Sequence, residues 1–288
     1  MYFTGGDHVW TIYQGPPREY GDKLINGDRF FLGGQRQFQA REGVELARGM
    51  SGLLRELSDY RYDTSSEQPG STFVGSIPNK REINASINVF GDTPAEFRAN
   101  LRRWQDNHPE DSEGRLWFLT SDGEPRYLPV RPSPSAGLSS IETDPTILRK
   151  LEGMEWGWTS DEPYFLGYIS RQEFVDGSVT FYNPSTAKVV YPKIYLPGPG
   201  KYTVGEITTP VLAANEMVRI DYNPLHETYV KLNLTTGAVQ NLWYTLEGKR
   251  PKLGLKPQTK NTISLTYTGA GTSMAPYVEF TPKFRSYI

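Results

Sequence analysis

Few residues of this chain stand at spacings that would support metal binding or nucleophilic catalysis. The 288 residues include no cysteine, which excludes a disulfide framework, a thiolate metal site and a thiolate nucleophile. His8, His108 and His226 are widely separated and form no HxH or HExxH motif, so the ligand spacing of a metal site is missing. We expect each histidine to lie on the surface or in a loop, and we predict no catalytic residue, no metal and no cofactor.

Two stretches match part of a nucleotide-binding or catalytic motif. Residues 198–201 have the glycine and lysine of a phosphate-binding loop, but Tyr202 stands where serine or threonine must follow, and Tyr195 where the first glycine is required. Residues 49–52 resemble a nucleophile elbow, but their second glycine comes one residue early. We interpret 198–201 as a plain turn and predict that the protein is not an enzyme.

Aromatic and acidic side chains leave two further hypotheses open. Trp243 with Tyr244, or Tyr191 with Tyr195, could stack on sugars from one face of a β-sandwich; the alternative is that these aromatics fill its core. We therefore keep glycan contact at Trp243 and Tyr244 as the alternative function, a carbohydrate-binding module. A glycosidase with dispersed carboxylates is the weakest hypothesis, because sequence shows no pair at the required separation.

The clearest secondary structure lies between Ile83 and Val130. Apolar and polar residues alternate from Ile83 to Val89, which is typical of a half-buried strand. Thr93-Pro94-Ala95-Glu96 then predicts a helix start, because threonine can cap, proline suits the first position and glutamate can close a capping box. Phe97, Leu101 and Trp104 form one apolar stripe, so we predict a short helix near 94–107 that packs on a sheet.

The rest of the sequence predicts many short strands. There are 28 Gly and 22 Pro, and turn residues separate β-prone stretches at short, regular spacing in the second half, which is typical of a sandwich. We predict a mostly β protein with two domains, 1–165 and 166–288. Leu242 to Leu246 is one expected strand of the second domain, and Pro145 to Leu151 is an expected helical turn.

Residues 59–71 are polar and rich in turn formers. We expect either a mobile surface loop or an arm that orders against a neighbouring subunit through Tyr60, Arg61 and Tyr62, since interfaces favour tyrosine and arginine. The next stretch, 73–77, is expected to form a hairpin with 82–90.

Net charge and hydropathy limit the partners. The formal net charge of −2 gives no basic excess for a nucleic-acid backbone, so we predict no specific nucleic-acid binding. No apolar run approaches the ~20 residues of a membrane span, and the N-terminus lacks the pattern of a signal peptide. We expect a protein that is made in the cytoplasm without a membrane span.

The order of these features resembles the distal tail proteins of long-tailed phages, a family also called minor tail proteins. The residues that carry the resemblance share order and spacing along most of the chain: 69–71, 79–83, the capped helix, 114–118, 122–128, 156–158, 161–165, 183–186, 191–194 and 220–222. The resemblance implies an N-terminal β domain that assembles into a homo-hexameric ring and a C-terminal galectin-like β-sandwich outside the ring. It also implies a place in the virion, at the tail tip, between the tail tube protein and the tip hub or tape-measure proteins.

Overall fold

The computed structural model consists of two units that are built mainly from antiparallel strands. It describes residues 10–20, 23–33, 42–64, 69–120, 123–134, 136–137, 144, 147–226, 228–246, 249–250, 252–269 and 274–288; His8 lies outside them. The first unit comprises residues 1–167 together with 285–288, and the second comprises 168–284. The prediction of a mostly β protein is confirmed.

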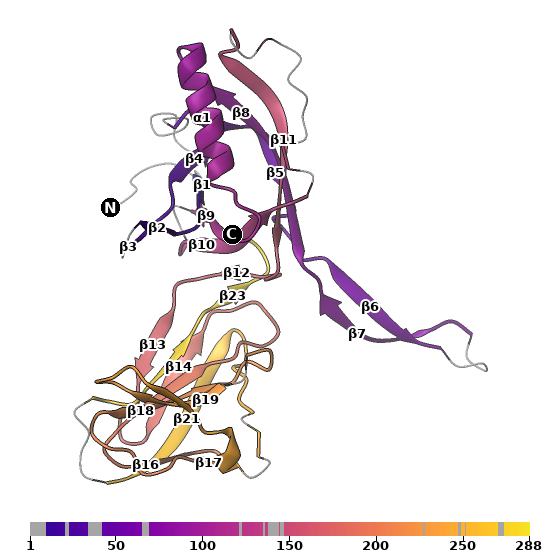
Figure 1. The fold of residues 1–288 in the computed structure, drawn as a ribbon. Helices are drawn as coiled ribbons and strands as arrows, with labels where there is room; N and C mark the ends of the chain where they lie inside the picture. Colours follow the sequence, from indigo (N-terminus) through magenta and orange to yellow (C-terminus); the bar gives the residue numbers. More distant parts are fainter. Residues whose placement is uncertain are drawn as a thin grey trace. The chain divides into compact units, whose positions relative to one another are not determined.

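The first unit contains one large antiparallel sheet with the strand order β4-β1-β9-β10-β11-β8-β5, and β12 pairs with β10 (Figure 1). Its strands are β1 (Trp10–Gln14), β4 (Arg29–Gly33), β5 (Val44–Ser51), β8 (Arg81–Phe90), β9 (Gly114–Leu119), β10 (Arg126–Pro132), β11 (Lys150–Ser160) and β12 (Phe165–Leu166). Two separate two-stranded sheets are formed by β2 (Arg18–Tyr20) with β3 (Lys23–Ile25) and by β6 (Ser58–Asp63) with β7 (Thr72–Pro78).

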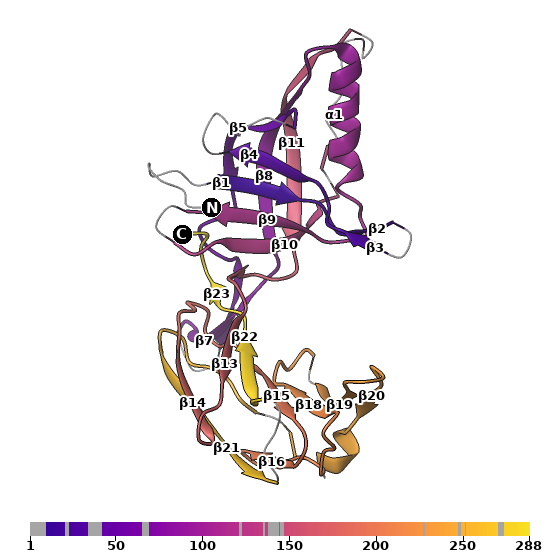
Figure 2. The same cartoon turned by 90° about the vertical axis from the view of Figure 1, so that its left-hand side faces the viewer.

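The predicted helix is confirmed as α1 (Pro94–Asp106), which lies along β8 and β11 (Figures 1 and 2). The Thr93 hydroxyl accepts a hydrogen bond from the Glu96 backbone N–H at 3.1 Å. The Glu96 carboxylate in turn accepts from the Asp92 backbone N–H at 2.9 Å. Phe97 and Trp104 are buried as the stripe predicts, and the alternating face of β8 is buried against the same core.

An aromatic cluster fills the space at the end of α1. The His108 ring stacks on Tyr13 with 3.9 Å between ring centroids and an interplanar angle of 9°, and Trp104, Trp156 and Trp158 surround it. His108 lies just after α1 and outside regular structure, but the expectation of a surface position is wrong: the ring is buried, with its Nδ1 2.7 Å from the Trp104 carbonyl oxygen. Burial lowers the pKa of His108 from its ordinary 6.5 to about 3.

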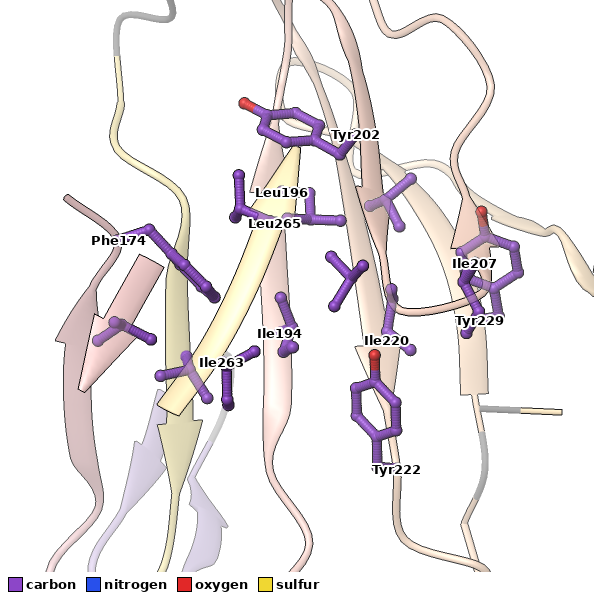
Figure 3. Close-up of a cluster of buried hydrophobic side chains, with 14 of the residues drawn as sticks. Phe174, Ile194, Leu196, Tyr202, Ile207, Ile220, Tyr222, Tyr229, Ile263 and Leu265 are labelled. Atoms are coloured by element: carbon purple, nitrogen blue, oxygen red, sulfur yellow. The ribbon is translucent and has the colours of Figure 1, made fainter. Parts of the chain in front are cut away.

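The second unit is a sandwich of two antiparallel sheets, with orders β13-β22-β15-β18-β19-β20 and β14-β21-β16-β17. The elements are β13 (Ser170–Glu173), β14 (Ser178–Asn183), β15 (Lys193–Pro197), β16 (Lys201–Val204), β17 (Ile207–Thr208), β18 (Glu216–Asp221), β19 (Thr228–Asn233), β20 (Val239–Asn241), β21 (Thr259–Thr268), β22 (Tyr277–Phe280) and β23 (Lys283–Phe284). Buried side chains from both sheets make its core, including Ile194, Ile220 and Ile263 (Figure 3). The predicted sandwich is therefore confirmed.

One predicted element is wrong, and a second is shorter than expected. Residues 243–246 form a 3-10 helix, η1 (Trp243–Leu246), instead of a strand, because the Asn241 side chain accepts from the Trp243 backbone N–H at 2.8 Å and starts a turn there. The helical turn expected at 145–151 is confirmed in part, because the backbone N–H groups of Ile147 and Leu148 donate to the Asp144 carbonyl oxygen at 3.1 and 3.2 Å. It is shorter than expected, since Lys150 already pairs with Phe90 as the first residue of β11. His226, in contrast, is exposed next to a turn, as predicted.

Candidate functional site

The hairpin of β6 and β7 is the feature of the first unit that most requires a partner. Its two strands pair with each other and, among the described residues, with no other strand. Figure 1 shows them running together away from β5 and β8. A two-stranded hairpin has little stability of its own, because it lacks a third strand or a packed helix. The expected loop at 59–71 is thus wrong for its described start, where residues 59–63 are strand.

Several large apolar side chains of this hairpin are exposed to solvent. Tyr60, Tyr62, Phe73, Val74 and Ile77 are each between 43% and 58% exposed. The Phe73 ring lies 5.9 Å from the ring of Tyr60 and 5.8 Å from that of Tyr62, edge-on to both. Exposed apolar side chains that contact one another, as these three rings do, mark interaction sites on soluble proteins. We call these five residues the hairpin patch.

Sequence reasoning identifies part of the hairpin patch and misses the rest. The predicted contacts Tyr60, Arg61 and Tyr62 all lie on β6, and all three are exposed. The hairpin predicted between 73–77 and 82–90 is wrong, because β7 pairs with β6, whereas β8 pairs with β5 and β11. The apolar residues 73, 74 and 77 do not alternate as a strand with one buried face would, which indicates exposure on both faces but not the partner strand.

The base of the hairpin is held by hydrogen bonds from a buried arginine. The buried guanidinium of Arg81 donates to three backbone carbonyl oxygens, those of Gly52 at 2.7 Å, Pro163 at 2.9 Å and Arg285 at 2.8 Å. Arg285 also forms an ion pair with the buried Glu56, at 3.4 Å. Charged groups are buried at acceptable cost only when they are paired in this way. The hairpin therefore leaves the first unit at a point that three hydrogen bonds and an ion pair hold in place.

The proposed glycan residues do not form one stacking platform. Tyr244 is 72% exposed, and its hydroxyl accepts from the Gln240 side chain at 3.4 Å. Trp243 is half-buried and packs against the core of the second unit. Tyr195 stacks on Tyr277 at 4.6 Å between centroids. The structure therefore exposes one of the two residues, Tyr244, and uses the other mainly for packing.

Within the described residues, neither the partial catalytic motifs nor the search for membrane-spanning helices adds a second candidate site. The described residues include no group of three or more histidine, aspartate or glutamate side chains that could hold a metal ion. At 198–201, the Gly200 backbone N–H donates to the Leu212 carbonyl, so this stretch is bonded as a sheet connection. No helix in the described part of the chain is both long and apolar enough to cross a bilayer.

Comparisons with known proteins support the fold assignment. No protein-family model matches the sequence, and no curated protein matches it. Among solved structures, the chain is similar to the crystal structure of the Dit protein of phage SPP1, described as a paradigm of the hub adsorption apparatus in phages that infect Gram-positive bacteria. That match has a TM-score of 0.59 and 15% identity, and covers 96% of this chain and 99% of the other.

Two structures of the phage P2 baseplate in its activated conformation are also similar. The one with calcium has a TM-score of 0.51, 10% identity and coverage of 97% and 99% of the two chains. The one with strontium has a TM-score of 0.53, 10% identity and coverage of 98% and 100%. The chain therefore has the fold of phage distal tail and baseplate proteins, and the resemblance drawn from the sequence is confirmed at the level of fold.

Proposed function

We propose that this chain is a structural, non-enzymatic component of a phage tail tip, and that it works as one subunit of a ring. The fold supports a tail role, because similar chains occur in a hub adsorption apparatus and a baseplate. The observation that carries the ring is the hairpin patch, which exposes five large apolar side chains on a hydrogen-bonded base. A ring subunit needs complementary surfaces and no active site.

A second copy of the same chain is the partner that fits this surface best. A hairpin that projects from one side of a subunit contacts a different surface of its neighbour, and repeated head-to-tail contacts of this kind form a ring when the rotation between subunits closes. Tyrosine and arginine, which are enriched at interfaces, stand side by side at residues 60–62 of the hairpin. The number six, and the galectin-like character of the second unit, rest on the family resemblance of the sequence.

The ring would join the tail tube protein to the tip hub or tape-measure proteins within the virion. A formal net charge of −2 suits a wall along which DNA passes without specific binding. The subunits would be made in the host cytoplasm before tail assembly.

Electron microscopy tests this proposal directly. Purified protein should give closed rings, and labelled antibody against the chain should mark the tail tip of intact virions. A chain that stays monomeric at high concentration and is absent from the tip would contradict both parts.

Carbohydrate binding is the second candidate, and the exposure of the Tyr244 ring favours it. A glycan array with the wild-type chain and with Trp243→Ala and Tyr244→Ala variants separates the two functions. Binding that the Tyr244→Ala change abolishes supports a glycan-binding module, whereas no binding to any glycan leaves the ring as the function.

A further inference from the structure

The second unit contains a groove that neither the ring nor the exposed Tyr244 uses. Its volume is about 990 Å³, and it lies between the turn that joins β16 to β17, the middle of β21 and the segment around residues 249–253. Pockets of about 300–1,000 Å³ are typical of small-ligand sites. The groove is large enough for several units of a small oligomer.

One tyrosine hydroxyl in the groove is available to a ligand. Tyr222 is 4% exposed and lines the groove, and its hydroxyl forms no hydrogen bond with any described residue. Tyr202 and Tyr229, which belong to the same core (Figure 3), donate to the carbonyl oxygens of Pro197 and Thr208. Burial raises the pKa of Tyr222 well above its ordinary value, so this hydroxyl remains a donor at neutral pH. The hydroxyl oxygen is not one of the fully buried side-chain atoms that lack a partner, so it reaches the solvent of the groove and can donate to a ligand oxygen there.

The rim of the groove is cationic. Lys249, Arg250 and Lys252 all line it, all are exposed, and none forms an ion pair within the described part of the chain. Glu206 is the one acidic side chain among the described lining residues. Lysine and arginine together bind phosphate oxygens well, the former as a point charge and the latter as a planar fork. The groove therefore favours an anion.

The remaining lining groups suit a polyol. Thr262 and Ser264 add exposed side-chain hydroxyls, while Ile207 and Ile263 supply apolar surface against which C–H groups can lie. An acidic peptide is the competing anionic ligand, because clustered cations also bind acidic motifs; the side-chain hydroxyls of Thr262 and Ser264 favour the polyol.

We propose that this groove binds a chain of polyol or sugar units that carry phosphate groups. The phosphates contact Lys249, Arg250 and Lys252, and one ligand oxygen accepts from the Tyr222 hydroxyl. The proposal does not depend on ring assembly, because every residue involved belongs to the second unit of one chain.

Isothermal titration of the full chain with a poly(glycerol phosphate) oligomer tests the proposal. Replacing all three groove cations with alanine should weaken binding at least about tenfold, as expected for the loss of several charge-assisted contacts. Tyr222→Phe removes only the hydroxyl and should weaken binding about threefold to tenfold. The matched control replaces three other exposed lysines of the second unit, Lys188, Lys201 and Lys260, and should bind like wild type.

Four outcomes would overturn the proposal. These are no binding of the oligomer, equal losses in the groove and control variants, equal affinity for a neutral glycerol-based oligomer, and equal or tighter binding of a poly-glutamate peptide. Inorganic phosphate alone should bind far more weakly than the oligomer; equal affinity would contradict a chain-binding groove. Circular dichroism confirms that each variant is folded, and electron microscopy of the same samples reports ring assembly separately.

Discussion

Arg81 donates a hydrogen bond from its guanidinium to the backbone carbonyl of Arg285, a residue 204 positions later in the sequence. The last four residues thereby belong to the first unit, where Tyr287 also packs against Phe118, with 5.4 Å between ring centroids. Arg81 directly follows the β7–β8 turn, so the same side chain fixes both the chain end and the base of the hairpin.

Removing the Arg81 guanidinium should destabilise the first unit strongly. In Arg81→Met, the carbonyl oxygens of Gly52, Pro163 and Arg285 lose their donor in a buried site, and we expect a loss of about 3–5 kcal/mol in the free energy of unfolding. Urea unfolding of the wild-type and variant chains measures this loss. Arg102→Ala, at an exposed position of α1, is the control and should change stability by less than about 0.5 kcal/mol. Equal effects of the two changes would contradict the role of Arg81.

His108 should make the first unit less stable as the pH falls below neutrality. The folded pKa is about 3 and the ordinary value is 6.5; between these values the unfolded chain binds a proton that the folded chain does not. The contribution of His108 to the free energy of unfolding is therefore fully present above pH 6.5 and declines as the pH falls toward 3. The expected decline between pH 7 and pH 5.5 is about 1 kcal/mol.

Unfolding curves at pH 7 and pH 5.5, followed by tryptophan fluorescence, measure this change. His108→Phe keeps an aromatic ring beside Tyr13 and removes the titration, so its stability should vary less between the two pH values. A variant with the full pH dependence of the wild type would show that other groups cause it.

The N-cap of α1 should contribute measurably to stability. Thr93→Ala removes the acceptor for the Glu96 backbone N–H, and the expected loss is about 1 kcal/mol. Thr93→Ser keeps the hydroxyl and should retain most of the stability. Thermal unfolding of the two variants side by side makes the comparison, and equal losses would rule out the hydroxyl as the cause.

The hairpin patch should control self-association without affecting the fold. Replacing Tyr60, Tyr62 and Phe73 with serine removes three exposed rings, and we expect the dissociation constant between subunits to rise at least about a hundredfold, as for the loss of interface hot spots. Analytical ultracentrifugation measures it, with unfolding midpoints as a check on folding.

The matched control replaces three exposed apolar residues of the second unit, Val175, Val211 and Leu225, with serine. This variant should assemble like wild type. If both variants lost assembly equally, general surface hydrophobicity and not the hairpin would drive association.

Local patterns explain which elements the sequence could predict. The start of α1 depends on Thr93 and Glu96, which are three residues apart, and β8 is half-buried, so its residues alternate. The strand pairing of β6 with β7 could not be read in this way, because both faces of that hairpin are exposed and the apolar residues mark a surface for a partner.

The remaining features arise from contacts between distant residues. His108 is buried because Tyr13, from the first strand, stacks on it, and no neighbouring residue in sequence indicates this. The groove combines Tyr222 with cations some 30 positions later, a proximity that only the sandwich creates. The return of the chain end to the first unit likewise depends on a tertiary contact, that of Arg81 with Arg285.

The mass of the purified wild-type assembly tests the central claim most directly. Native mass spectrometry should show a dominant species at six times the 32.6-kDa chain mass, which the hairpin-patch variant reduces to single chains. A wild-type protein that remains a single chain at every concentration, with the patch exposed, would contradict the account.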